Sequence, residues 1–152
     1  TDASATFNTN TFTAKKYLMV EIYGNQSSGN SDTAIRFNSD TGSNYCRRYS
    51  TNGGSDGTGT ANDRLNNVMA AEGNRDPFHS NSFILNKSDQ EKLIICHLIF
   101  AESGAGAGNA PSRRETVNKW VNTASQITSI QVLSSPSVAF DAGSFIRVWG
   151  SD

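Results

Sequence analysis

The sequence predicts an all-β protein, an antiparallel β-sandwich that is jelly-roll-like, and three observations lead to this fold class. Asn, Ser, Thr and Gly dominate the 152 residues, and only three residues are proline. Short runs alternate apolar and polar residues, the period of two that places successive side chains on opposite faces of a strand. Turn-rich loops separate these runs and helical periodicity is hard to find, which is typical of sandwiches and jelly rolls.

About nine strands are expected. Residues 17–23, YLMVEIY, put Leu18, Val20 and Ile22 on one face. Residues 92–100, KLIICHLIF, are apolar on both faces, which predicts a strand covered on both sides. A helix is the alternative for that segment, but its β-branched residues favour a strand. The remaining strands are expected at residues 6–12, 33–38, 44–50, 81–86, 115–122, 127–133 and 144–149.

The phase of these strands predicts the hydrophobic core, because side chains two residues apart share a face. The expected core residues are Leu18, Val20, Ile22, Ile35, Phe37, Ile94, Cys96, Leu98, Ile130, Val132, Ile146 and Val148.

The chain is expected to form one domain over residues 1–152, with residues 1–12 as an extended N-terminal arm or an edge strand. The arm is expected to lie across a neighbouring subunit and bury its two phenylalanines there. Residues 50–63 and 103–112 are small and polar, which predicts surface loops. The best helix candidate is residues 62–73, NDRLNNVMAAEG.

Charge and hydropathy exclude two classes of partner. The formal net charge is −1, so no general electrostatic attraction draws the chain to nucleic acid or acidic lipid. No stretch approaches the ~20 apolar residues of a membrane span. We therefore expect neither nucleic acid nor membrane as a partner.

The candidate metal ligands and thiols do not form a recognisable site. Residues 38–44, NSDTGSN, are rich in oxygen ligands but lack the alternating Asp pattern and distal Glu of a calcium loop, so an Asx-type turn explains them better. Cys46 and Cys96 lie in strand-like runs and are expected to be buried free thiols, with a disulfide as the alternative. No CxxC or Cys/His cluster indicates zinc. We expect no metal and no cofactor.

No catalytic residue stands out either. His79 is expected in a turn and His97 in a strand, where the adjacent Cys96 points to the opposite face. No GxSxG motif accompanies them. The acids cluster near turns and strand ends, and nothing pairs two of them across a cleft. These acids are Glu72, Asp76, Glu91, Glu102 and Glu115. The chain is therefore expected not to be an enzyme.

Two further features are open to a binding function. Trp120 and Trp149 are expected to be core or rim aromatics, with sugar stacking as the alternative. Residues 34–50 have the shape of a hairpin and place Arg36 near a polar turn. Arg47 and Arg48 follow the turn, which leaves a binding site, a metal loop or a well-made turn open, and Arg36 is expected to pair with Asp40 or cap turn carbonyls.

The chain also resembles a known module over nearly its whole length. RFNSDTGSNY at residues 36–45, preceded by KYLMVEIYG at residues 16–24, is similar to the opening of a β-sandwich module in structural proteins of tailed phages. Residues 120–150, from WVNTASQITSI to SFIRVWG, resemble its closing segment, with Trp149 where the module has Tyr. Residues 81–100 lie where the module has a strand, an Asn-containing turn and a long strand.

This resemblance implies a virion structural protein, most simply a capsid-decorating (cement) or tail-associated subunit located in the virion. The implied partners are the major capsid or tail protein and further copies of the chain, with a trimer as one homo-oligomeric state. The alternative is a glycan-recognising, lectin-like receptor-binding module without catalysis. The module carries no catalytic constellation, so the resemblance transfers no catalytic, cofactor-binding or metal-binding residue. It implies instead that Arg36, Arg47 and Arg48 belong to a hairpin signature that serves the fold.

Overall fold

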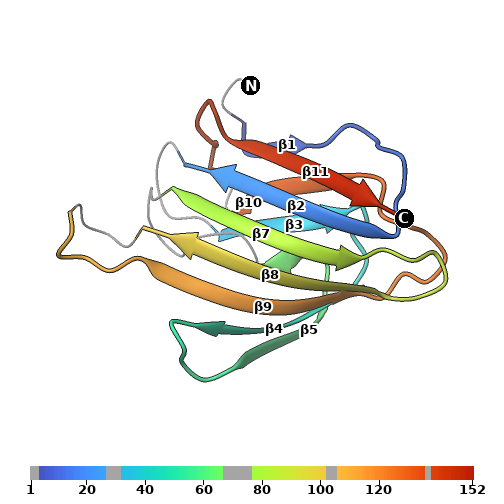
Figure 1. Cartoon of the computed structure of the whole chain (residues 1–152), viewed down its shortest axis with the longest axis horizontal. Coiled ribbons are helices and arrows are strands. Elements are labelled where there is room, and N and C mark those ends of the chain that lie inside the picture. The colour runs from blue at the N-terminus through green and yellow to red at the C-terminus, as the bar shows by residue number, and fades with distance from the viewer. Residues whose placement is uncertain (1–3, 27–31, 67–76, 102–105, 136–137) are drawn as a thin grey trace.

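The computed structural model describes residues 4–26, 32–66, 77–101, 106–135 and 138–152. In these ranges the chain forms eleven strands in two antiparallel sheets that pack against each other (Figure 1). They contain no helix, and so none long and apolar enough to cross a membrane. The predicted fold class, an antiparallel β-sandwich, is confirmed.

The two sheets differ in size. The small sheet has the order β1 (Thr6–Asn8), β10 (Ile130–Ser135), β3 (Asp32–Phe37), β6 (Leu65–Asn66). The large sheet has the order β11 (Phe145–Ser151), β2 (Tyr17–Gly24), β7 (Phe78–Leu85), β8 (Lys92–Phe100), β9 (Ser112–Trp120), β4 (Tyr45–Thr51), β5 (Gly57–Asn62).

The connections follow the jelly-roll pattern. Hairpins join β4 to β5, β7 to β8 and β8 to β9, and every other connection leads from one sheet to the other. A jelly roll interleaves two four-stranded sheets in this way. Here the three-stranded β7–β8–β9 meander occupies the place of one inner strand, and β11 adds a further strand beside β2.

The strand prediction is wrong in one region. Residues 50–63, expected to be a loop, contain the end of β4 and all of β5. Asn52 and Gly53 both have positive φ, 52° and 76°, which is the geometry of a tight hairpin turn. The helix expected at residues 62–73 is also not seen where it can be checked, because Leu65–Asn66 is strand β6. Its remainder from residue 67 lies outside the described residues.

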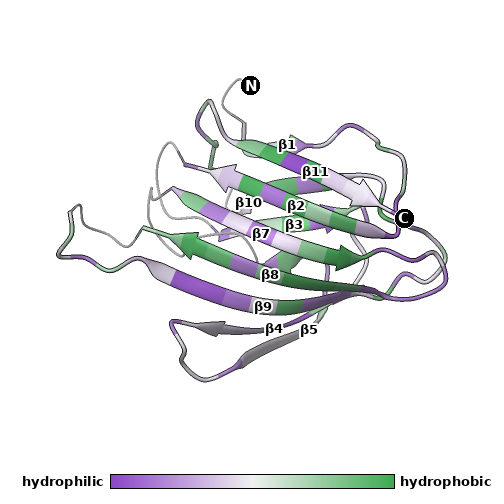
Figure 2. Cartoon of the chain, viewed as in Figure 1, coloured by the Kyte–Doolittle hydropathy of each residue, from purple (hydrophilic) through white to green (hydrophobic). Residues whose placement is uncertain are grey.

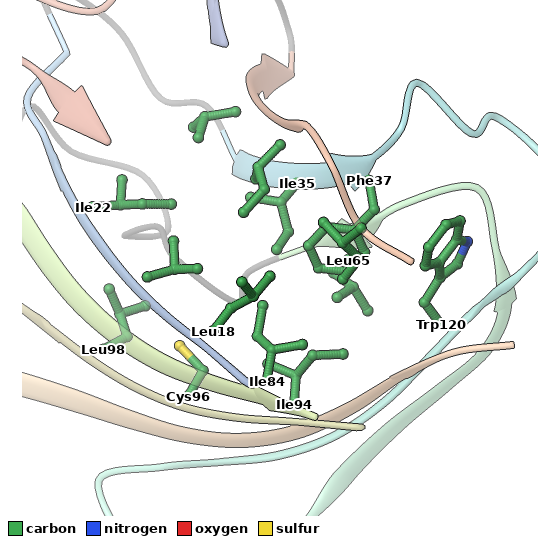
Figure 3. Close-up of a cluster of buried hydrophobic side chains, with 14 of the residues drawn as sticks. Leu18, Ile22, Ile35, Phe37, Leu65, Ile84, Ile94, Cys96, Leu98 and Trp120 are labelled. Carbon is green, nitrogen blue, oxygen red and sulfur yellow. The ribbon is translucent and has the colours of Figure 1, made fainter. Parts of the chain in front are cut away.

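The core lies between the sheets, as Figure 3 shows for the side chains of β2, β3 and β8. Ten of the twelve predicted core residues are buried. The other two, Ile146 and Val148 on edge strand β11, are only partly buried and pack against the cluster. The aromatic end of the core consists of Phe37, Tyr45 and Trp120, with ring centroids 5.8–6.4 Å apart.

The N-terminal segment belongs to the fold. Strand β1 pairs with β10 at the edge of the small sheet. The ring of Phe7 meets that of Phe140 edge to face at 4.9 Å, and Phe12 packs against the same core. The expectation that these two rings cover a neighbouring subunit is therefore wrong.

Two asparagine carboxamides hold the segment that leads into β10. Asn38 Oδ1 accepts hydrogen bonds from the backbone N–H of Thr128 (2.9 Å) and Ser129 (3.1 Å). Asn86 Oδ1 accepts one from Ile127 N–H (2.6 Å), and its Nδ2 donates to the Ile127 carbonyl (3.1 Å). These bonds satisfy backbone groups at the point where the chain passes from the large to the small sheet.

Truncation of Leu98 to Ala should lower the free energy of unfolding by about 2–5 kcal/mol, because its side chain is fully buried. Leu93→Ala on the same strand is the matched control, since Leu93 is 51% exposed. Denaturant unfolding should be measured at a protein concentration low enough for the protein to be monomeric. Equal midpoints for the two variants would contradict the assigned phase of β8.

Candidate interaction surface

The segment with three arginines, residues 34–50, is not a hairpin. Strand β3 lies in the small sheet and β4 in the large sheet, so residues 38–44 form an arch between the sheets. Tyr45 anchors the arch, since its hydroxyl accepts a hydrogen bond from Phe37 N–H at 3.1 Å and lies 3.2 Å from the Asp40 carbonyl.

The arginines have separate roles. Arg36 pairs with Asp63 and not with Asp40, and its Nε donates to the Asp63 carbonyl at 3.1 Å. Arg47 donates to the Asn66 carbonyl. Arg48 lies on the opposite face of β4, exposed and 3.3 Å from the carboxylate of Asp56. The three side chains therefore do not converge on one site.

The Asp40 carboxylate is occupied by the protein itself. It accepts hydrogen bonds from Trp120 Nε1 (2.7 Å), Asn44 Nδ2 (2.9 Å) and Gly42 N–H (2.8 Å). Partial burial raises the pKa of this carboxyl, but the three hydrogen bonds outweigh burial and the net pKa lies below its usual value. The oxygen-rich turn thus stabilises the arch. Among the described residues, no group of three His, Cys, Asp or Glu side chains is placed to hold a metal ion.

The histidines and cysteines are spread over both faces of the large sheet. His79 lies in β7 and not in the predicted turn, with Nε2 3.1 Å from Glu21 Oε1. His97 is exposed on β8, whereas the adjacent Cys96 is buried. Both cysteines are free, and Cys46 is half-buried where burial was expected. Burial raises the pKa of the Cys96 thiol to about 11.

The acids do not form a catalytic pair in the part of the chain that can be described. Glu91 pairs with Lys119 at 3.0 Å, and Glu115 with Arg113 at 2.6 Å. The other three candidates, Glu72, Asp76 and Glu102, lie outside the described residues.

The two tryptophans differ in accessibility. Trp120 is 1% exposed, so its ring is closed to a sugar, while Trp149 is 49% exposed on β11. The exposed Trp149 belongs to an apolar surface that was not predicted from the sequence. Leu93, Ile95 and Ile99 are each more than half exposed, so β8 is not covered on both sides.

Exposed apolar side chains gather on the outer face of the large sheet, the face turned away from the small sheet. Strand β8, mostly green in Figure 2, lies near the middle of this sheet. The cross-strand register aligns five of these side chains in one row over five neighbouring strands. The row is Trp149, Met19, Phe83, Ile95 and Val117. Tyr17 and Leu93 lie two residues along their strands, and these seven residues are called the outer patch below.

The outer patch is large for a single chain. Its members are 38–60% exposed, and at the usual side-chain areas they present ~700 Å² together. The largest apolar patch on an ordinary soluble monomer is roughly 300–600 Å². Scattered exposed hydrophobic residues need no explanation, but a contiguous surface of this size indicates an interaction site.

The outer patch has relief. An open hollow of about 460 Å³ lies over β7, β8 and β9, among Phe83, Leu93, Ile95 and Val117. A second hollow of about 290 Å³ lies between Phe83 and Trp149. The Phe83 ring, 60% exposed, borders both. The outer patch is therefore hollowed on both sides of the exposed Phe83 ring, with Trp149 at its β11 end and aliphatic side chains at its β9 end.

A row of polar residues borders the outer patch. The register places Arg147, Glu21, Asn81, His97 and Glu115 side by side across the same five strands. Glu21 Oε2 lies 3.2 Å from the guanidinium of Arg147. The contact with His79 is the main cause that lowers the pKa of the Glu21 carboxyl. The ion pair between Glu21 and Arg147 neutralises two charges of this row, which is called the polar border below.

Comparison with protein-family models, curated protein sequences and solved structures found no match. The functional proposals below therefore depend on the chain's own surface and on the resemblance of its motifs.

Asp40→Asn should lower the free energy of unfolding at pH 7 by about 1–3 kcal/mol, because an amide cannot accept all three hydrogen bonds. The folded pKa of Asp40 is lowered, so its stabilisation is present above the unfolded value of about 3.9. It is lost as pH falls through the folded pKa. Denaturant unfolding across this pH range should therefore show the two proteins converging in acid. If the difference in free energy of unfolding between wild type and Asp40→Asn stays constant down to about pH 2, the Asp40 carboxylate does not stabilise the fold through its charge.

Thiol labelling of the native protein at about pH 8 should modify Cys46 quickly and Cys96 only on unfolding, because Cys96 is buried and protonated. Cys46→Ser should abolish the fast phase, and Cys96→Ser should leave it intact. Fast labelling that survives in Cys46→Ser would show that the inner face opens to solvent.

Proposed function

We propose that the chain is a virion structural protein, a capsid-decorating or tail-associated subunit that functions through surface contacts. The observation that supports this proposal most directly is the outer patch. It is an apolar surface of ~700 Å² on the regular face of a rigid sheet, and such a surface fits another folded protein. The resemblance of residues 36–45 and 120–150 to modules of tailed-phage structural proteins supports the same assignment.

The architecture suits a subunit that is present in many copies. A β-sandwich provides a rigid frame, and protein neighbours on a particle would cover both the outer patch and the sheet edges. Many copies on one lattice add their individual contacts through effective concentration, so each contact can be modest. We propose the major capsid or tail protein as the partner, together with further copies of the chain.

Glycan recognition is the second candidate, and one observation favours it. Trp149 is half exposed beside Arg147 and the polar border, a combination of aromatic platform and polar groups that a sugar can use. The rest of the outer patch is aliphatic and offers few hydrogen-bond partners. The protein-contact function therefore accounts for more of the surface.

Electron microscopy of intact particles with gold-labelled antibodies against the chain tests the proposed function. Labels at regular positions on the head or tail are expected. A glycan array with the purified protein, run with Trp149→Ala as the matched control, tests the second candidate. Particles free of label, together with glycan binding that Trp149→Ala abolishes, would replace the structural assignment with receptor recognition.

A further inference from the structure

We propose that a second copy of this chain packs against the outer patch, so that the large sheets of neighbouring copies face each other. This inference deepens the proposed function, because it names the partner of the surface on which that function rests. Three properties of the surface carry it: its area, its relief and the order of its side chains.

The area matches what a stable contact between two copies needs. A standard interface buries about 800 Å² on each partner. The outer patch presents ~700 Å² by the side-chain areas used above, and the polar border adds a rim. Apolar residues at the centre with polar residues around them are the usual anatomy of such an interface.

The relief is complementary to itself. The Phe83 ring stands between the two hollows, and Ile95 and Val117 line the larger one. The Phe83 ring of one copy can therefore enter the larger hollow of another, beside Ile95. A pair about a twofold axis parallel to the strands makes this contact twice, once in each direction.

The order of side chains along the row is also consistent with a twofold pair of copies. An axis parallel to the strands keeps the rows in line and reverses their order across the strands. Phe83 of one copy then faces Ile95 of the other, and Met19 faces Val117. Arg48, next after Val117 in the same row, falls opposite Trp149, where a guanidinium and an indole ring attract each other.

The charges do not oppose this arrangement. The polar border of one copy lies over that of the other and places Glu21 opposite Glu115, but each of these carboxylates already carries a cationic partner within its own chain. Glu21 is paired with Arg147, and Glu115 with Arg113. Neutralised rows can approach without the repulsion that unpaired carboxylates would cause.

Light scattering coupled to size exclusion tests the inference on the intact chain, whose mass is 16.3 kDa. The wild type is expected to have the mass of two chains. The double variant Phe83→Thr with Ile95→Thr should have the mass of one chain, because it removes the centre of the outer patch. Threonine retains strand propensity, so circular dichroism should still show a folded β-protein.

The matched control is Asn8→Thr with Asn10→Thr, two exposed positions outside the outer patch. This control should keep the wild-type mass. If the threonine variant fails to fold, Trp149→Ser with Val117→Thr provides the second test at the two ends of the row.

A monomeric wild type would overturn the inference, and so would an oligomer whose mass the outer-patch variants leave unchanged. Particle labelling reports separately on the proposed function. A monomer that labels particles leaves that function standing and assigns the outer patch to another protein, whereas an oligomer absent from particles refutes the function but not the self-association.

Discussion

The carboxamides of Asn38 and Asn86 fix how one sheet closes over the other. Residues 126–129 pass between the sheets, where an unpaired backbone group would cost about 1–3 kcal/mol. The two side chains come from opposite sheets, Asn38 after β3 and Asn86 after β7, and both bond to this one segment. Because the segment leads directly into β10, these bonds set where the small sheet lies on the inner face of the large one.

The unequal size of the sheets has a direct consequence for function. Four strands pack against seven, and they all lie on the inner face of the large sheet. Nothing among the described residues packs on the opposite face, where β8 still carries Leu93, Ile95 and Ile99. A strand that is apolar on both faces needs a packing partner on each face, and the described part of the chain provides one, the small sheet. The packing partner of the other face is the one that we propose.

Period-two alternation was enough to predict most of the residues of β2, β3 and β8 that face the core, because most inner side chains in these strands are apolar. The buried Thr33 and Lys92 are polar and were not predicted. It could not predict β5, Gly57–Asn62, since this strand has no large apolar side chain and forms by pairing with β4 through the Asn52–Gly53 turn. The Arg36–Asp63 pair joins residues 27 positions apart and has no local signal. The apolar outer face of β8 was visible in the sequence, but alternation cannot tell a cover within the chain from a cover by a partner.

The outer patch lies within the segments that carry the resemblance, except for Val117, but it uses the outward-facing residues of their strands. Asn38, Asp40 and Tyr45 organise the arch between the sheets and are directed away from the outer face. In β2 the two functions alternate residue by residue, with Leu18 and Val20 in the core and Tyr17 and Met19 in the outer patch. Substitutions at the inner positions therefore act on the free energy of unfolding, and those at the outer positions on the association that we propose. A chain of this kind can change its partner without changing its fold, because the two faces of a strand contact different neighbours.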